Sequence, residues 1–318
     1  MALCLSSMTH AKSLAITCPY HMPIRGHTPA PVLRKGSFRR PSDGVRLRRF
    51  FCRECGRGFS EATRTLEYRQ RKRYINKFLF VLLSSNNSMR RSAIITRVAR
   101  KTVDHRLRYF SKVADHYQRR LLEDLAPIKE IHFDDMETSE HTKMKPLAIP
   151  LAVENPSRLI VSFDVASMPA KGLLAEKSRK KYGSRLDERA ESWRHVLTTA
   201  GKLSTPGVVI TTDSHKRYPG VIRRYIPHAK HVQVKGRRGC VAGQGELKVG
   251  GRDPLFSLNH TAAMLRANIC RLIRRTWCTT KRKDRLRCHI ATYVMWHNET
   301  ILAKRQGREP RFPFPDAI

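Results

Sequence analysis

Negative charge is scarce in this sequence. Among its 318 residues, 26 are Asp or Glu and 63 are Lys or Arg, which leaves a formal net charge of +37. The excess is spread from Arg34 to Arg311 rather than held in one tail. Such a balance predicts a broad surface that neutralises phosphates and binds nucleic acid in a salt-sensitive way. A ribosomal-type structural protein is the alternative, although such proteins are usually shorter.

Long apolar runs are also absent. The longest candidate, residues 78–83, falls far short of the roughly 20 residues that a membrane-spanning helix needs, so we expect no membrane partner. Residues 1–17 lack a basic segment and a convincing apolar segment before a cleavage site, and we expect a disordered or non-native start. The eight cysteines include one Cys-x-x-Cys pair, which fits a reducing compartment with a metal site better than disulfide bonds. A cytoplasmic location is therefore expected.

The composition changes along the chain. Residues 18–60 are rich in Cys, His, Pro and Gly, residues 61–125 have helical periodicity, and residues 126–300 alternate strand-like and helical patterns. Residues 301–318 are rich in Pro and Arg and are expected to form a flexible tail. The alternation in residues 126–300 predicts a mixed α/β domain.

A metal site is predicted near the amino terminus. Cys52 and Cys55 form a Cys-x-x-Cys turn followed by glycine, which suits two thiolates on one metal ion. Structural zinc takes a tetrahedral set of ligands, and Cys18 with His21 supplies a second pair in the spacing Cys-x-x-His. His27 is an alternative to His21. We expect a zinc ribbon in residues 18–60, and the alternative is a metal-free ribbon with free thiols.

Three helices are predicted in residues 61–125. Apolar stripes mark helices at residues 74–83 and 89–95, and Thr102 is a candidate cap for a third. Helix, helix, short turn and helix outline a helix-turn-helix unit that binds DNA. The alternative is a helical spacer with solvated charges. Basic residues expected on or beside the exposed face of the third helix are Lys101, Arg106, Arg108 and Lys112.

Two aspartates are the best catalytic candidates. Asp134 and Asp213 each close a strand-like apolar run. Two carboxylates at the ends of two strands are a natural seat for Mg²⁺ or Mn²⁺ acting on phosphodiesters. Strand alternation points the neighbouring Asp135 to the opposite face, so we expect Asp134 to be the ligand. Asp164 is a weaker candidate.

A third ligand is expected on a following helix, predicted over residues 258–273. Asn259 and Arg266 lie two turns apart on one face of it. Asn259 can offer an amide oxygen to the metal ion while Arg266 holds a DNA phosphate, and the alternative is that both decorate a surface. Glu246 is a rival, although it lies in a glycine-rich stretch.

A basic stretch at residues 271–287 follows that helix. Its tryptophan suits stacking on a base at a frayed DNA end, and its arginines suit contacts with the DNA backbone. The alternative is a solvated basic helix. The expected DNA-binding residues here are Arg271, Arg274, Arg275 and Trp277.

The order of predicted elements in residues 126–300 resembles a ribonuclease H-like mixed sheet flanked by helices. Beyond this outline, residues 52–300 resemble bacterial insertion-sequence transposases of the DDE superfamily, related to the insertion-element-one group. The resemblance rests on Cys-Arg-Glu-Cys-Gly-Arg-Gly-Phe-Ser at 52–60, Phe-Asp-Asp-Met-Glu-Thr at 133–138, Thr-Thr-Asp-Ser-His at 211–215, and the run from Leu-Asn-His-Thr at 258–261 through Arg-Arg-Thr-Trp at 274–277.

This resemblance implies an enzyme that binds the terminal repeats of a mobile element and a target DNA. It implies cleavage and strand transfer with Mg²⁺ or Mn²⁺ held by Asp134, Asp213 and Asn259, a structural zinc, and a homo-oligomer on DNA. Asn259 stands where most relatives have Glu, although some branches have Asn followed by a basic residue, as Arg266 is here. The competing expectations are a decayed or domesticated DNA-binding regulator and a junction- or RNA-directed nuclease of the same fold.

Overall fold

The computed structural model describes residues 16–20, 32–125, 127–235, 240–241, 244–248, 251–274 and 276–314. The chain forms two compact units, Met1–Ile75 and Asn76–Ala317. Residues 61–75, which the sequence groups with the helices, thus belong to the first unit.

The first unit contains a three-stranded antiparallel sheet of β1 (Val32–Arg39), β2 (Arg46–Cys52) and β3 (Gly58–Ser60). The 3₁₀ turns η2 (Glu61–Arg64) and η3 (Arg73–Ile75) follow. A tight turn joins β2 to β3, in which the Gly56 N–H donates to the Cys52 carbonyl at 3.0 Å and Gly56 takes a φ of +66°. Glycine suits this position because other residues rarely adopt positive φ. The turn brings Cys55 back beside Cys52.

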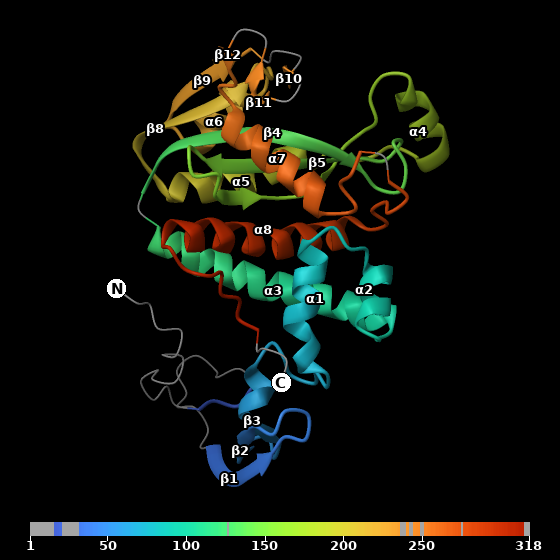
Figure 1. The fold of residues 1–318 in the computed structure, drawn as a ribbon, viewed down its shortest axis with the longest axis vertical. Coiled ribbons are helices and arrows are strands. Elements are labelled where there is room, and N and C mark those ends of the chain that lie inside the picture. Colours follow the sequence, from blue (N-terminus) through green and yellow to red (C-terminus); the bar gives the residue numbers. More distant parts are fainter. Residues whose placement is uncertain are drawn as a thin grey trace. The chain divides into compact units, whose positions relative to one another are not determined.

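The second unit begins with α1 (Asn76–Ser84), α2 (Met89–Ile95) and α3 (Arg100–Asp124), so the three predicted helices are confirmed. Ser88 caps α2 by accepting the Arg91 N–H at 3.2 Å. The predicted cap of α3 is wrong: Ala99 is the cap residue, and the Thr102 N–H donates to its carbonyl at 2.8 Å. This helix runs beside α8 (Lys283–Arg305), which packs against it (Figure 1).

The main sheet is mixed, which confirms the α/β class. Its strands are β4 (Ile128–Ser139), β5 (Pro146–Glu154), β6 (Ile160–Phe163), β8 (Ser204–Asp213) and β9 (Lys230–Val234) in the order β6-β5-β4-β8-β9, with β7 (Ala166–Ser167) paired to β5. β4, β5 and β6 are antiparallel, whereas β8 is parallel to both β4 and β9. β5 is buried along almost its whole length, as expected of a strand covered on both faces.

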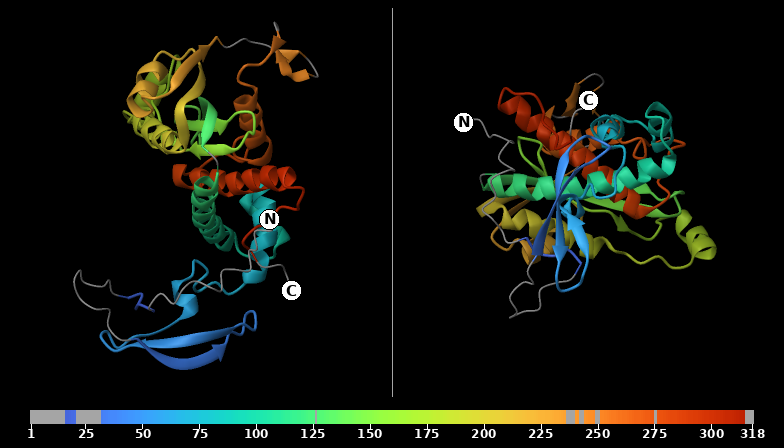
Figure 2. Two further views of the ribbon diagram at one scale, coloured as in Figure 1. Left: turned by 90° about the vertical axis from the view of Figure 1, so that its left-hand side faces the viewer. Right: turned by 90° about the horizontal axis from the view of Figure 1, so that it is seen from below.

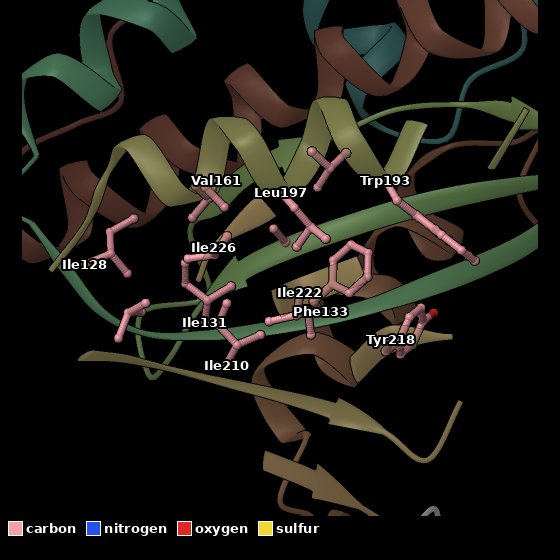
Figure 3. Packing of buried hydrophobic residues seen from close by; sticks show 14 of the residues in the cluster. Ile128, Ile131, Phe133, Val161, Trp193, Leu197, Ile210, Tyr218, Ile222 and Ile226 are labelled. Carbon is pink, nitrogen blue, oxygen red and sulfur yellow. The ribbon is translucent and has the colours of Figure 1, made fainter. Parts of the chain in front are cut away.

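Helices cover both faces of this sheet. One face packs on α5 (Arg189–Lys202) and α6 (Tyr218–Tyr225), while α7 (Phe256–Asn268) crosses β4 and β5 on the other (Figures 1 and 2). Apolar residues one helical turn apart place Trp193, Val196, Leu197 and Ala200 of α5 in the core. They meet Ile131 and Phe133 of β4 (Figure 3).

Several elements differ from the predictions. α4 (Leu174–Tyr182) is a helix that no apolar stripe in the sequence predicts, and a small sheet of β10 (Cys240–Val241), β11 (Gln244–Lys248) and β12 (Gly251–Arg252) occupies the glycine-rich stretch. α7 ends at Asn268, before the predicted residue 273. Among the described residues, no helix combines the length and apolar character needed to cross a bilayer.

The carboxyl-terminal segment is packed rather than loose as far as residue 314. α8 continues to Arg305, and Glu299 on it accepts the Arg311 N–H at 2.8 Å. Phe312 and Phe314 place their rings 4.9 and 5.0 Å from that of Phe80 in α1. The expectation of a flexible tail thus fails for these residues because their aromatic side chains complete the helical core.

Candidate functional site

Asp134 and Asp213 lie side by side in neighbouring parallel strands. The last paired residues of β4 and β8 are Phe133 and Thr212, and the two aspartates come next in each strand. Asp213 ends β8, as predicted. Asp134 does not end β4, because the pairing with β5 continues from Asp134 to Ser139. Asp134 therefore lies inside β4, at the level where the neighbouring strand β8 ends.

The local contacts fix the Asp134 carboxylate. Its Oδ1 accepts the Asp135 N–H at 2.7 Å and the Tyr218 hydroxyl at 3.0 Å. Burial, followed by the negative charge of Asp213, raises the pKa of Asp134 to about 6, while the two hydrogen bonds oppose that rise. Asp213 is held by the His215 N–H at 3.0 Å. Two carboxylates in mutual repulsion are stabilised by a cation placed between them.

Asp135 has a different environment from Asp134. Its two carboxylate oxygens lie 2.9 and 3.0 Å from the Trp193 indole nitrogen of α5, which donates to them. Burial raises the pKa of Asp135 to about 7. The Tyr218 hydroxyl donates to Asp134 and accepts the Asp135 N–H at 3.2 Å, and its ring lies 5.7 Å from that of Trp193. The sequence reasoning missed Trp193 and Tyr218. Their only signal in the sequence is that each is a large aromatic residue in a predicted helix next to the strand that ends at Asp213.

The donor chemistry at Asp134 and Asp213 fits a hard divalent cation. Magnesium is commonly held by one or two carboxylates, with waters and substrate phosphates completing its shell. Asp134 and Asp213, side by side on neighbouring parallel strands, supply two such oxygen donors. The negative charge of Asp213 adds to burial in raising the pKa of Asp134, and a cation would offset that charge.

The predicted third ligand is engaged elsewhere. Asn259 is exposed on α7, and its amide nitrogen donates to the Asp253 carboxylate at 2.7 Å. Asp253 is 5% exposed and also accepts the Leu255 N–H at 3.1 Å. Burial lowers the pKa of His132 in β4, and the charges of Glu130 and, more weakly, Asp253 oppose that shift. Asn259 is thus held by Asp253, a residue that sequence reasoning did not select. The side chain of the rival, Glu246, lies outside the described part.

Arg266 lies at the carboxyl-terminal end of α7 and is half-buried. Burial lowers the pKa of Arg266, and the positive charge of Arg274 lowers it further. Two guanidinium groups close enough to repel each other favour an anion between them. The predicted contact of Arg266 with a DNA phosphate stays a prediction.

Three cysteines form a second site in the first unit. The sulfur atoms of Cys18, Cys52 and Cys55 all lie within 4.8 Å of one another. Within the part of the chain that the structure describes, no other group of three or more Cys, His, Asp or Glu side chains has this spacing. The Cys55 N–H lowers the pKa of the Cys52 thiol, whereas burial raises that of Cys18. The cluster fits a thiophilic metal ion, but the predicted fourth ligand, His21, and its alternative, His27, lie outside the described residues.

The predicted DNA-binding residues differ in their exposure to solvent. Lys101, Arg108, Lys112, Arg274 and Trp277 are exposed, and Arg108 lies 3.4 Å from Asp104. The prediction that Arg106 lies on the exposed face is wrong, since it is 7% exposed. α3 packs on α1 and α2 as well as α8, so a wider arc of the helix is buried than the apolar stripe indicates. Arg271 is half-buried against Met89, and Arg275 lies outside the described residues.

In comparisons with known proteins, no model of a protein family matches the sequence, and no curated protein matches it.

Proposed function

We propose that this protein is a transposase that binds the ends of an insertion element and, with Mg²⁺ or Mn²⁺, cuts DNA and joins the freed strand to a target. The observation that carries the proposal is the placement of Asp134 and Asp213 side by side on neighbouring parallel strands of a mixed sheet. The strand order and directions agree with a ribonuclease H-like catalytic domain. Such an enzyme acts in the bacterial cytoplasm, at the nucleoid.

In this proposal Asp134 and Asp213 hold the cation in their charged forms. The bound cation supplies charge stabilisation at the scissile phosphate and activates the attacking oxygen. Tyr218 and the Asp135 N–H fix the orientation of the Asp134 carboxylate, as their bonds of 3.0 and 2.7 Å to the same oxygen indicate. Asp135, bonded to Trp193, takes a packing role.

Arg266, near the end of α7, and Arg274, in the connection between α7 and α8, serve as phosphate contacts in this proposal. Asn259 completes the set as the group that replaces the usual third acid. Because Asp253 takes its amide nitrogen, the amide oxygen of Asn259 is the atom left to act as a ligand. Asp253 then acts as the positioning residue for Asn259.

The remaining parts supply DNA recognition. The three-cysteine cluster is assigned to structural zinc, and the exposed basic residues of α3 and of the α7–α8 connection to backbone contacts. Trp277, which is fully exposed, is assigned to stacking on an unpaired base at an element end. A homo-oligomer that bridges two DNA ends is part of the proposal.

A second candidate is a DNA-binding regulator that has lost its chemistry. The observation that favours it is the 2.7 Å bond that engages Asn259 with Asp253 in place of the aspartate pair. A regulator needs the basic surfaces but not the carboxylates. It therefore predicts binding to element ends without cleavage.

Strand transfer by purified protein on a duplex carrying its own element end distinguishes the two. The reaction is run with Mg²⁺ or Mn²⁺ for the unmodified chain, Asp134→Ala, Asp213→Ala and Asn259→Ala. Glu137→Ala is the matched control, since Glu137 lies on β4 but is exposed and paired with Lys171 at 2.9 Å.

Metal-dependent joining by the unmodified chain and by Glu137→Ala, with loss of joining in the other three variants, supports a transposase that has Asn259 in its active site. End binding without cleavage by the unmodified chain supports the regulator. Joining by Asn259→Ala, with loss in Glu246→Ala, would show that Glu246 is the third ligand. A preference for branched or RNA–DNA hybrid substrates would identify a nuclease instead.

A further inference from the structure

Two thiols meet in the connection between α7 and α8. The sulfur atoms of Cys270 and Cys278 are 3.2 Å apart, and both cysteines are free. Cys270 is 6% exposed, while Cys278 is partly accessible. Neither belongs to the aspartate site or to the three-cysteine cluster.

The surrounding backbone holds the two thiols together. The Asn86 N–H donates to the Asn268 carbonyl at 2.8 Å, and the Cys270 thiol points to the Asn87 carbonyl at 3.8 Å. These bonds tie the end of α7 to the segment between α1 and α2. On the other side, the Cys278 N–H donates to the Thr276 hydroxyl at 2.9 Å. Cys270 thus lies on backbone tied to another segment, whereas the bond at Cys278 is local to its own turn.

The two thiols have opposite character. The hydrogen bond from Cys270, with the charge of Arg271, lowers the pKa of Cys278 to about 6. The same hydrogen bond, with burial, raises the pKa of Cys270. These shifts favour the thiolate form at Cys278, the more accessible sulfur, and the protonated form at Cys270. A thiolate is the form that attacks electrophiles.

We propose that Cys270 and Cys278 form a peroxide-reactive dithiol, with Cys278 as the attacking sulfur and Cys270 as the resolving one. The Cys278 thiolate attacks one oxygen of hydrogen peroxide, the O–O bond breaks, and the hydroxide that leaves takes a proton to become water. Cys278 becomes a sulfenic acid. The Cys270 sulfur then attacks Cys278, the S–O bond breaks, and the thiol proton leaves with the hydroxide as a second water. Two thiols are oxidised to one disulfide while one peroxide is reduced to two waters.

The disulfide closes a ring over residues 270–278. That ring contains Arg271, Arg274 and the fully exposed Trp277. Oxidation also removes the thiolate charge beside Arg271. The modification therefore changes the shape and charge of this connection. Any effect on DNA binding rests on the proposed function, but the thiol chemistry does not.

The test uses the full-length, metal-loaded protein treated with hydrogen peroxide at pH 6. Peptide mapping by mass spectrometry without reductant identifies the linked cysteines, and dimedone traps sulfenic acid. The variants are Cys270→Ser, Cys278→Ser and, as matched control, Cys288→Ser, which removes another partly exposed cysteine of the same unit. Melting curves confirm that each variant folds.

We expect a Cys270–Cys278 link in the unmodified chain and in Cys288→Ser, reversible by a dithiol reductant. Cys270→Ser should accumulate dimedone on Cys278, and Cys278→Ser should form neither link nor adduct at Cys270. Consumption of peroxide by Cys278 should be about tenfold faster at pH 6 than by an ordinary thiol of pKa about 8.5, since its thiolate fraction outweighs its weaker nucleophilicity.

The proposal is overturned if the unmodified chain forms no Cys270–Cys278 link, or links either cysteine to Cys288 instead. It is equally overturned if Cys278 reacts no faster than the ordinary thiol. Because these readouts involve no DNA, a failure of the transposase proposal leaves them unaffected.

Discussion

Replacing Asp134 with Asn should make the metal-free protein more stable at alkaline pH. Asn has the same shape, and its amide oxygen can still accept the bonds that Tyr218 and the Asp135 N–H donate to Asp134 at 3.0 and 2.7 Å. What the change removes is a largely buried negative charge that faces Asp213. The variant therefore isolates the electrostatic cost of the site.

The magnitude follows from the pKa of Asp134. A rise from 3.8 to about 6 corresponds to roughly 3 kcal/mol, at about 1.4 kcal/mol per unit, and partial exposure lowers the expected gain to about 1–2 kcal/mol. The folded pKa lies above the unfolded one. The stability contributed by the protonated carboxyl is thus complete below pH 3.8 and is lost as the pH rises through 6. The variant should match the unmodified chain near pH 4 and exceed it at pH 8.

Melting temperatures between pH 4 and pH 8 test this, and an increase of about 2–6 °C at pH 8 is expected. Glu137→Gln, an exposed acid on the same strand, should shift stability by less than about 0.5 kcal/mol. Added Mn²⁺ should raise the melting temperature of the unmodified chain but not that of Asp134→Asn. An Asn variant that is no more stable at pH 8, or whose gain does not fade toward pH 4, would refute the reasoning.

Three further outcomes are expected. Cys52→Ser should lose the zinc bound by the purified protein, measured by elemental analysis; retention of zinc would place the metal elsewhere. Trp277→Ala should leave the melting temperature unchanged because the ring is fully exposed, yet weaken binding to a frayed DNA end in fluorescence anisotropy; Trp296→Ala, which removes a ring stacked on Phe312, should instead lower the melting temperature. Leu197→Ala, at a fully buried position, should cost about 2–5 kcal/mol in urea denaturation, and a cost below 1 would contradict the described core.

The sheet was predictable because its signals are local. Short apolar runs bounded by polar residues give β4, β5 and β8, and the aspartate pair follows from where two of those runs end. Because parallel neighbours in register bring their carboxyl ends together, the side-by-side placement of Asp134 and Asp213 also follows once the strands are adjacent. The three amino-terminal helices have similarly clear apolar stripes.

The wrong predictions concern residues whose environment is set by tertiary contacts. Asn259 bonds to Asp253, six positions earlier, because the chain before α7 brings that carboxylate next to the first turn of the helix. Arg106 is buried because α3 packs against several helices at once. α4 contains mostly Lys, Arg, Glu and Ala, which favour a helix by propensity although they provide no apolar stripe.

The aspartate pair is also unusual in its lack of basic partners. The chain has 63 Lys and Arg, and several other carboxylates, among them Asp104 and Asp187, lie beside an arginine that lowers their pKa. Among the residues that the structure describes, no ion pair joins Asp134 or Asp213 to a basic side chain, and no basic group offsets the raised pKa of Asp134. In a protein so rich in arginine, folding could have neutralised these acids at little cost. A cation from solution would stabilise this carboxylate pair beyond what the hydrogen bonds from Tyr218 and the backbone provide, and that is the strongest physical argument for a metal site here.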